Sequence, residues 1–246
     1  MERLMLNRLV ETLAWDSNFF HFGVGRLNAS SIEEIREGIS LARQEGKKLL
    51  YFAADSESAL AKQAKQEKLQ FVGDQVLFKM DLKNAAASHK SNHFHVIPYA
   101  KRAPTQQLID LAIQAGGMSR YSIDPNFSQE QFFDLYKAWI ENSCRHEIAD
   151  IVMTAENLGT DTLGLVTVRT AGPASTIGLI SVSNNHRRQG VASALTDSAI
   201  NFSINQNCDA LFVSTQQNNK NACALYQSQG FSVEKTESWF HAWIGS

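Results

Sequence analysis

The sequence lacks the features that define several large classes of protein. Its three cysteines, Cys144, Cys208 and Cys223, are odd in number and show no Cys-x-x-Cys spacing, so neither a disulfide framework nor a zinc site is expected. No segment approaches the ~20 consecutive apolar residues of a membrane span, and the N-terminus lacks an apolar run long enough for a signal peptide. These absences predict a cytoplasmic protein with reduced thiols.

The chain also has little net charge. Its formal value of −2 at pH 7 argues against a general nucleic-acid-binding surface. The aliphatic and aromatic content is that of an ordinary globular protein and gives no sign of disorder. A chain of 246 residues can bury a sizeable core, as one large domain or two small ones. Small molecules are therefore the expected partners, and no metal, nucleic acid or membrane is expected.

Residues 176–192 are the segment around which the chain is organised. Apolar residues in 177–182 predict a short strand, two asparagines interrupt it, and the spacing becomes helical from Gly190. The intervening loop supplies two cations, unpaired N–H groups at a helix N-terminus, and a glycine that lets a ligand approach the backbone. Such a loop suits a pyrophosphate, although an ordinary turn with solvated arginines has the same residues. The nucleotide P-loop pattern Gly-x-x-x-x-Gly-Lys-Ser/Thr is absent.

Two motifs carry a resemblance to a known family. Arg187-x-x-Gly190-x-Ala192, after an apolar strand, resembles the acetyl-CoA pyrophosphate loop (Arg/Gln-x-x-Gly-x-Gly/Ala) of the GNAT family of N-acetyltransferases. Downstream, residues 219–231 resemble that family's later helix, with an Asn, a Leu-Tyr pair and a closing Gly-Phe. The resemblance implies an α/β (α+β) fold with a mixed, mostly antiparallel central sheet flanked by helices. A smaller, incomplete GNAT-like domain is expected to precede it.

The same resemblance implies that acetyl-CoA is the cofactor. Its pantetheine arm is expected to lie between two strands that splay apart, along the central strand, with its pyrophosphate on the amides of residues 188–193. Backbone donors of this kind can polarise the thioester carbonyl. The implied cofactor-binding residues are Leu179, Ile180, Ser181, Val182, Arg187, Arg188, Gln189, Gly190, Val191, Ala192, Ser193 and Asn219.

Tyr226 matches the position of the family's general acid. A phenol of pKa ~10 stays protonated at neutral pH and can donate to sulfur as charge develops on the leaving thiolate. A core tyrosine on an amphipathic helix is the alternative, but Asn219 lies about two turns earlier on the same face. No residue stands out as the general base. Asp74 or Glu141 could act through water, or the amine could lose its proton to bulk water.

The order of helix, strand, helix and strand in the first half matches that of the C-terminal half. Leu50-Tyr51-Phe52 matches Leu211-Phe212-Val213, and Val76-Leu77-Phe78 matches Ser238-Trp239-Phe240, at a nearly constant offset. We interpret this as a degenerate duplication whose first copy has no basic glycine loop. A chance similarity between βαβ units is the alternative. The expected domains are 1–83 and 95–246, joined by a polar linker at 84–94.

Local patterns predict the remaining elements. In the first half they are a helix at 31–46 capped by Ser31, a strand at 49–53, a helix at 57–68 and a strand at 75–82. Ser128 and Gln131 form a capping box that opens a helix. The second half otherwise has strands at 95–98, 150–157, 163–170, 177–182, 211–214 and 239–243, and helices at 105–114 and 219–228.

A closer resemblance, covering most of the chain, suggests the substrate. Trp15-Asp-Ser-Asn-Phe19-Phe20 with Gly23-Val24, Ser119-Arg120, and Trp139-Ile-Glu-Asn142 look like the dTDP-4-amino-4,6-dideoxygalactose (dTDP-fucosamine) N-acetyltransferases. These enzymes also pair an incomplete N-terminal domain with a full acetyltransferase domain. The aromatic cluster is equally typical of a core or an interdomain seam. The implied substrate-binding residues are Trp15, Phe19, Phe20, Arg120, Tyr121 and Asn142.

The resemblance thus implies acetyl transfer to the amino group of a dTDP-4-amino-4,6-dideoxy sugar, with the galacto epimer favoured. Such a product would serve surface polysaccharide, lipopolysaccharide or O-antigen biosynthesis. Cations around Arg120, Lys137 and Arg145 fit an anionic diphosphate better than a cationic polyamine or aminoglycoside. An enzyme for another small amine and a non-catalytic acyl-CoA sensor are the alternatives, and a sensor would not need Tyr226. The expected partner is a dTDP-linked amino sugar, with a homodimer as an open possibility.

Overall fold

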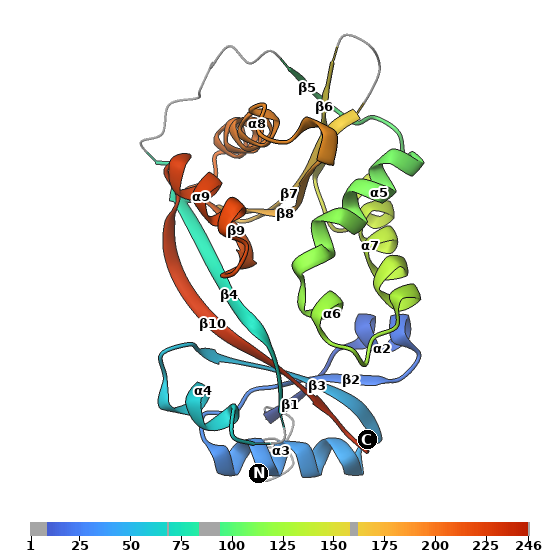
Figure 1. The fold of residues 1–246 in the computed structure, drawn as a ribbon, viewed down its shortest axis with the longest axis vertical. Coiled ribbons are helices and arrows are strands. Elements are labelled where there is room, and N and C mark those ends of the chain that lie inside the picture. Colours follow the sequence, from blue (N-terminus) through green and yellow to red (C-terminus); the bar gives the residue numbers. More distant parts are fainter. Residues whose placement is uncertain (1–8, 68, 84–93, 158–161, 246) are drawn as a thin grey trace. The chain divides into compact units, whose positions relative to one another are not determined.

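The computed structural model describes residues 9–67, 69–83, 94–157 and 162–245 (Figure 1). The chain divides into two compact units. The larger unit is Val76–Glu234, and the smaller one combines Met1–Gln75 with Lys235–Ser246. Strands β4 (Gln70–Asp81) and β10 (Ser232–Trp243) contribute residues to both.

The larger unit is a mixed sheet with helices on both faces. Its strand order is β10-β4-β9-β8-β7-β6-β5, in which β5 to β8 are antiparallel neighbours and β8 runs parallel to β9. The strands are β5 (His95–Pro98), β6 (Ile151–Glu156), β7 (Thr162–Ala171), β8 (Ala174–Val182) and β9 (Ala210–Gln216). The helices are α5 (Gln106–Ala115), η1 (Gly116–Met118), α6 (Arg120–Ile123), α7 (Gln129–Cys144), η2 (Asn184–His186), α8 (Val191–Asn205) and α9 (Lys220–Ser228).

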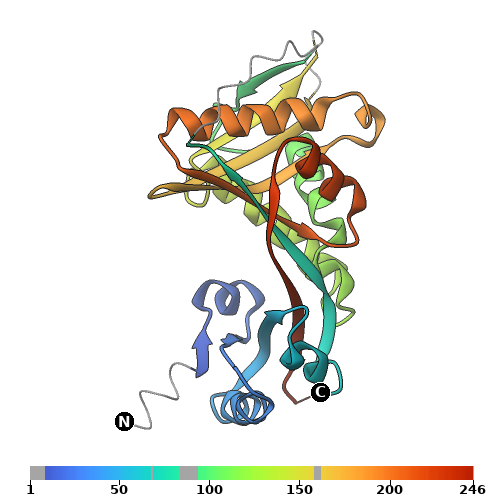
Figure 2. The same ribbon diagram turned by 90° about the vertical axis from the view of Figure 1, so that its left-hand side faces the viewer.

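Helices cover the two faces of this sheet differently. α8 lies on one face, and α5 with α7 lies on the other (Figures 1 and 2). Alternating strand residues supply the apolar layer beneath α8, where Val166, Val191 and Leu195 are almost completely buried. Gly164 lets α8 pack closely, because a Cβ there would lie 3.0 Å from Leu195 Cδ1. This packing fixes α8 against the strand that precedes it in the chain.

The smaller unit has its own sheet and core. Its elements are β1 (Val10–Thr12), α2 (Ala14–Phe20), β2 (Gly23–Leu27), α3 (Ile32–Gln44), β3 (Lys47–Asp55) and α4 (Ala59–Ala64). β2 pairs parallel with β3, and β3 pairs antiparallel with β10 from Leu49↔Trp243 to Asp55↔Glu237. The core contains Ile35, Leu50, Phe52 and Phe240, each no more than 1% exposed. The unit therefore depends on the C-terminal segment for part of its core.

Most local predictions are confirmed. Ser31 caps α3 by accepting a hydrogen bond from Glu34 N, and Ser128 and Gln131 form the expected capping box at α7. The strand, loop and helix of 176–192 are present as β8, η2 and α8. α4 is shorter than the expected helix at 57–68, while β4 and β10 begin earlier than expected. Residues 158–161, between the strands expected at 150–157 and 163–170, lie outside the described residues.

The structure places the expected domain boundaries differently. Lys235–Ser246 belongs to the smaller unit because Glu237–Trp243 of β10 pairs with β3. Residues 76–83 belong to the larger unit, where Leu82 N donates to Asp209 O at 2.9 Å beside β9. The expected linker falls, except for Phe94, outside the described residues. That the smaller unit is a degenerate copy stays a prediction.

Among the helices of the described ranges, none is long and apolar enough to cross a membrane.

Candidate active site

β8 and β9 are paired over only part of their length. Their parallel ladder begins at Ala174↔Ala210, and its last pair in the described chain is Ile177↔Val213. β8 then continues to Val182 and β9 to Gln216. Residues 178–182 consequently have an open edge toward β9, where backbone N–H and C=O groups can bond to an extended ligand.

A β-bulge marks the point at which the two strands part. Val168 pairs with Ile177 and Val166 with Ile180, so Gly178 and Leu179 together lie opposite one residue, Thr167. Leu179 N donates to the buried Thr167 Oγ1 at 2.9 Å. Gly178 itself is exposed. The backbone of Gly178, which has no side chain, is therefore exposed where the unpaired edge of β8 begins.

The N-terminus of α8 is arranged to bind an anion. Gly190 is its N-cap residue, with φ 89°, and the helix has neither a side-chain cap nor an acidic residue in its first turn. The first hydrogen bond of α8 among the described residues runs from Ala194 N to Gly190 O. The N–H groups of residues 191–193 are therefore left for a ligand, at the positive end of the helix dipole. A non-glycine residue at 190 would be strained at this φ.

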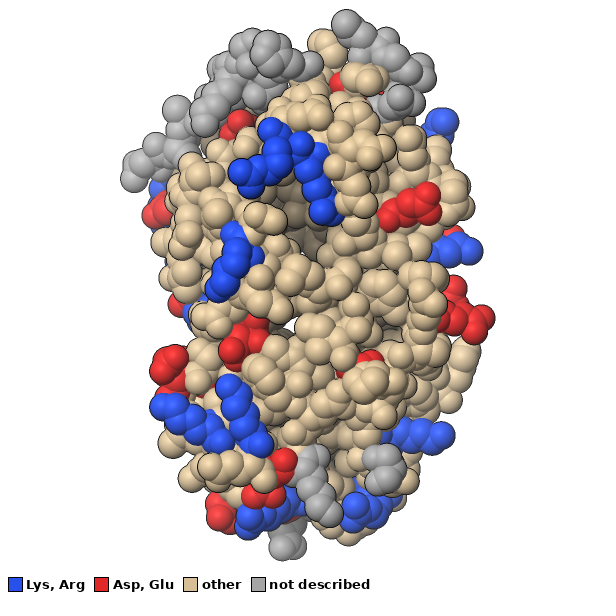
Figure 3. All heavy atoms as spheres, in the orientation of Figure 1, with Lys and Arg blue, Asp and Glu red and all other residues tan. Residues whose placement is uncertain are grey.

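The cations of this loop lie at the surface. Arg187, Arg188 and Gln189 are exposed, and Arg188 adopts a left-handed φ of 62°. Figure 3 shows Lys or Arg side chains at the rim of a hollow, over the place where Figure 1 draws the loop between β8 and α8. The charge and the free amides together suit a diphosphate.

Tyr226 of α9 is buried in the core of the larger unit. Only 2% of its surface is exposed, and its ring packs on Phe78 and Phe231 with centroids 5.5 and 5.7 Å away. Its hydroxyl makes no hydrogen bond to any described residue and is not one of the buried unpaired polar atoms, so the small exposed area includes it. Burial, with a smaller effect of Cys223, raises the pKa of Tyr226 above its ordinary value. Tyr226 is thus a neutral donor with a free hydroxyl.

Asn219 has a structural role that the sequence analysis did not recognise. It is the N-cap residue of α9, and its Oδ1 accepts a hydrogen bond from Ala222 N at 3.3 Å. Asparagine is among the strongest N-cap residues because it satisfies an amide that the helix leaves free. Its expected contact with the cofactor stays a prediction.

Gln114 of α5 was missed from the sequence. Its Nε2 donates to Ser181 Oγ at 2.6 Å and to Val182 O at 2.7 Å. It thereby fixes the end of β8 directly before the loop that leads into α8. A glutamine near the end of an amphipathic helix was the only sequence signal, and it did not indicate this partner.

The substrate residues expected in the larger unit lie on or beside α6 and α7. Arg120 donates to Tyr121 Oη at 2.8 Å, and its guanidinium lies 4.8 Å from the Tyr121 ring centroid. Asn142 is 9% exposed and accepts a hydrogen bond from Arg145, which also pairs with Glu147. Arg120 and Tyr121 are half-buried and therefore more accessible than the buried Asn142.

The substrate residues expected in the smaller unit lie on α2. Trp15 is 48% exposed and stacks on Phe19, with centroids 5.0 Å apart and planes at 6°. Phe20 is 5% exposed and belongs to the core of the unit, so it supports this pair. Asp74, a candidate base, accepts a hydrogen bond from Ser238 Oγ at 2.6 Å within the same unit. The other candidate, Glu141, is a half-buried residue of α7 in the larger unit.

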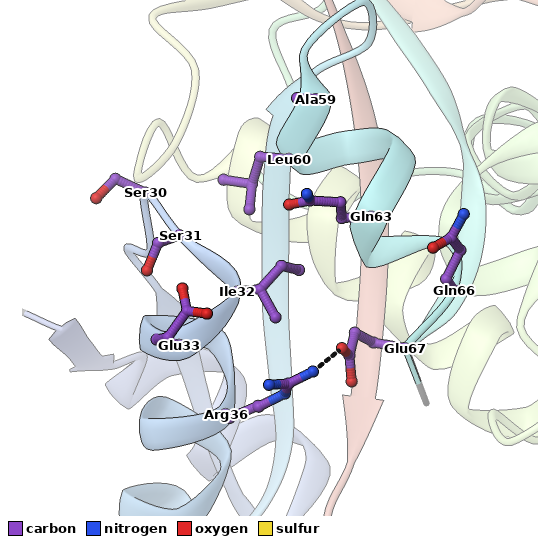
Figure 4. A pocket seen from close by; sticks show the side chains of 10 residues that line it. All are labelled: Ser30, Ser31, Ile32, Glu33, Arg36, Ala59, Leu60, Gln63, Gln66 and Glu67. Carbon is purple, nitrogen blue, oxygen red and sulfur yellow. Dashed lines mark hydrogen bonds and ion pairs between the residues drawn. The ribbon is translucent and has the colours of Figure 1, made fainter.

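In the smaller unit, the N-terminus of α3 differs from that of α8 because it carries acidic residues and a side-chain cap. At the start of α3, Glu34 Oε2 accepts hydrogen bonds from Ser30 N at 2.6 Å and Ser30 Oγ at 2.7 Å. These bonds lower the pKa of Glu34, so its carboxylate stays charged. Figure 4 shows the adjoining groove of about 470 Å³ between α3 and α4, where Arg36 pairs with Glu67 at 2.7 Å. The N-terminus of α3 thus has a side-chain cap, Ser31, and two acidic residues in its first turn, Glu33 and Glu34, which disfavour a bound anion.

Part of the larger unit is similar to a known family. Residues 121–231 match the model of the Acetyltransferase (GNAT) family. The chain is 23% identical over 141 residues to the Bacillus subtilis spore coat polysaccharide biosynthesis protein SpsD, which covers 57% of this chain and 48% of that protein. It is 40% identical over 65 residues to human N-acetyltransferase 8B, covering 26% of this chain and 28% of that protein. The matches thus span about half, or less, of these curated relatives.

Solved structures share the fold at low sequence identity. A tandem GNAT protein from the clavulanic acid biosynthesis pathway has a TM-score of 0.60 at 12% identity, covering 91% of this chain and 76% of that one. A protein of unknown function from Staphylococcus epidermidis has a TM-score of 0.62 at 14% identity, covering 91% and 84%. The expected GNAT fold is confirmed. The family match covers residues 121–231, and members of that family are acyltransferases that use acetyl-CoA as the acyl donor.

Proposed function

We propose that this chain transfers the acetyl group of acetyl-CoA to the amino group of a dTDP-4-amino-4,6-dideoxy sugar, with the galacto epimer favoured. The reaction would take place in the cytoplasm and serve surface polysaccharide biosynthesis. The observation that carries the proposal is the parting of β8 from β9 after Ile177↔Val213, directly before the uncapped N-terminus of α8. One segment thus offers both an open strand edge and an anion site.

The cofactor would use these two features together. Its diphosphate would accept hydrogen bonds from the amides of residues 191–193, with Arg187 and Arg188 supplying opposite charge. Its pantetheine arm would bond to the edge of residues 178–182 as an added strand. Because Gln114 fixes Ser181 and Val182, this edge needs little rearrangement on binding.

Acyl transfer then needs an unprotonated amine and a stabilised thiolate. The amine nitrogen forms a bond to the thioester carbonyl carbon, the carbon–sulfur bond breaks, and the amine releases a proton to water. Tyr226 would donate to the sulfur as negative charge develops. Its raised pKa makes complete proton transfer to a thiolate of pKa ~8.5 uphill, so the hydroxyl acts mainly as a hydrogen-bond donor.

Two observations support an amino sugar as the acceptor. The motifs around Trp15, Arg120 and Trp139 resemble those of dTDP-fucosamine N-acetyltransferases, and the relative SpsD is named for spore coat polysaccharide biosynthesis. Half-buried Arg120 also supplies a cation that suits the sugar's diphosphate. In the smaller unit, taken by itself, the exposed Trp15 stacks on the half-buried Phe19, and an aromatic surface of this kind can stack on a base.

The smaller unit is proposed as a degenerate copy that binds no cofactor. Each unit has a parallel strand pair joined by a helix, β2-α3-β3 in one and β8-α8-β9 in the other. β4 follows β3 in the chain but lies next to β9, and β10 follows β9 in the chain but lies next to β3. This is the arrangement that two copies would have if each had exchanged its last strand with the other. Glu33 and Glu34 disfavour an anion at the N-terminus of α3. Its loop also lacks the basic residues found before α8.

A screen of acceptors tests the proposal. The full chain is incubated with acetyl-CoA and a panel of dTDP-amino sugars, and released CoA thiol is followed against a blank without acceptor. We expect turnover with a 4-amino-4,6-dideoxy sugar and none with spermidine or an aminoglycoside. The 40% identity to human N-acetyltransferase 8B over 65 residues favours another amine as the second candidate. Turnover of a different amine would establish that candidate, and acetyl-CoA binding without any turnover would indicate a sensor.

A further inference from the structure

The side chain of Trp139 lies beside Gly178, where β8 parts from β9. An ideal Cβ on Gly178 would lie 3.7 Å from Trp139 Nε1 and 3.0 Å from Thr167 Oγ1. Gly178 is exposed, and Trp139 is half-buried. The Trp139 Nε1–H makes no hydrogen bond to a described residue and is not one of the buried unpaired atoms, so solvent reaches it. A free donor therefore points into the space where the open edge begins.

The indole is held in place by packing. Its ring stacks on Tyr136 with centroids 5.7 Å apart and planes at 13°. Tyr136 is itself 5% exposed and fits against Gly116, where a Cβ would come within 2.2 Å of its ring. Trp139 thus packs on Tyr136, and Tyr136 packs on Gly116 of η1. A donor so fixed loses little rotamer entropy when it binds a partner.

We propose that Trp139 is an acceptor-binding residue, whose Nε1–H donates to an oxygen of the amine substrate beside Gly178. This inference rests on the proposed acetyl transfer and narrows its substrate class. An indole N–H donates and cannot accept, so it binds a hydroxyl or phosphoryl oxygen and cannot form a hydrogen bond to a protonated amine. It thus favours a hydroxylated amino sugar over a polyamine.

The position of α7 on the sheet favours the amine substrate over acetyl-CoA as the ligand of Trp139. Trp139 belongs to α7, which lies on the face of the sheet opposite α8. The cofactor's diphosphate is proposed to lie at the N-terminus of α8, and its arm at the strand edge. The second substrate would therefore approach from the side of the sheet on which α7 lies, the side to which Trp139 belongs.

Indole resonances of the ¹⁵N-labelled full chain give a direct test. The chain has four tryptophans, and Trp139→Phe assigns one indole signal by its loss. The protein is first saturated with CoA, which cannot react, and then titrated with dTDP-4-amino-4,6-dideoxygalactose or with spermidine. We expect the Trp139 indole proton to move downfield with the sugar, and to stay in place with CoA alone and with spermidine.

Steady-state kinetics provide the second readout. Trp139→Phe keeps an aromatic ring on Tyr136 but deletes the donor, so kcat/KM for the amino sugar should fall about tenfold, the equivalent of one hydrogen bond. KM for acetyl-CoA should not change. Trp239→Phe, the same replacement in β10, is the matched control and should behave as wild type.

The outcomes separate this inference from the proposed function. An unchanged kcat/KM in Trp139→Phe, or an indole shift caused by CoA alone, overturns the inference even if the enzyme acetylates the sugar. A shift with the sugar but no turnover supports the inference and contradicts the proposed function. No shift with a sugar that the wild-type protein demonstrably binds also overturns the inference.

Discussion

Ile177 of β8 pairs with Val213 of β9, and no further pair between these strands follows in the described chain. The bulge at Gly178 and Leu179 comes next, so the two strands part where bare backbone is exposed. Gln114 then fixes Ser181 and Val182 from the neighbouring helix. A short segment thus combines an open edge with a rigid support, as an acyl-CoA arm that binds through backbone hydrogen bonds would need.

The loop before α8 should determine cofactor affinity. Arg187→Glu or Gly190→Asp places negative charge beside the proposed diphosphate, and Gly190→Asp also strains a φ of 89°. Calorimetry should show acetyl-CoA binding at least tenfold weaker, equivalent to ~1.4 kcal/mol or more. Arg102→Glu, in the loop between β5 and α5, makes the same charge change as a control and should bind normally. Unchanged affinity in a folded loop variant would remove this loop from the site.

The chain should bind one acetyl-CoA. The N-terminus of α8 has no side-chain cap and no acidic residue in its first turn, whereas α3 of the smaller unit is capped by Ser31 and has Glu33 and Glu34 in its first turn. Calorimetric titration should therefore saturate at one cofactor per chain. A second equivalent site that persists in Gly190→Asp would show that the smaller unit also binds acetyl-CoA.

The rate should have no falling limb at moderately alkaline pH. Because burial raises the pKa of Tyr226 above its ordinary ~10, the phenol keeps its proton throughout the range from pH 6 to pH 10. kcat/KM should rise as the amine substrate loses its proton and then reach a plateau. Rates are measured against a blank for thioester hydrolysis. A decline below pH 9 that is absent in Tyr226→Phe would contradict this assignment.

The sequence predicted features that depend on local chemistry. Ser31 caps α3 as predicted, and Ser128 with Gln131 forms the capping box of α7. These signals are readable because each involves residues within one turn of a helix. Asn219 before α9 could have been recognised as an N-cap by the same argument.

Features that depend on distant segments could not be predicted in this way. Glu237–Trp243 of β10 pairs with β3 of the smaller unit, although the two segments are far apart in the chain. Strand pattern shows that a segment is extended but does not identify its partner. Gln114 and Trp139 lie on amphipathic helices, where spacing alone suggests core residues. Their contacts with β8 follow from how α5 and α7 pack on the sheet.

The central claim is that this chain transfers an acetyl group and that Tyr226 assists departure of the thiolate. Tyr226→Phe preserves the ring that packs on Phe78 and Phe231 but deletes the hydroxyl. Stability and acetyl-CoA affinity should therefore change little, and both serve as controls for folding. The loss of rate should be smaller for an acyl donor whose thiol has a lower pKa, because a better leaving group needs less stabilisation.

The most direct test compares kcat of the wild-type protein and Tyr226→Phe with acetyl-CoA and a dTDP-4-amino-4,6-dideoxy sugar. The account predicts turnover by the wild-type protein and a decrease of roughly 10²–10³-fold in the variant, the usual effect of removing one hydrogen-bond donor to the transition state. Equal rates in the two proteins would show that Tyr226 is not the donor. Acetyl-CoA binding by both proteins, with no amino sugar acetylated by either, would contradict the proposed reaction itself.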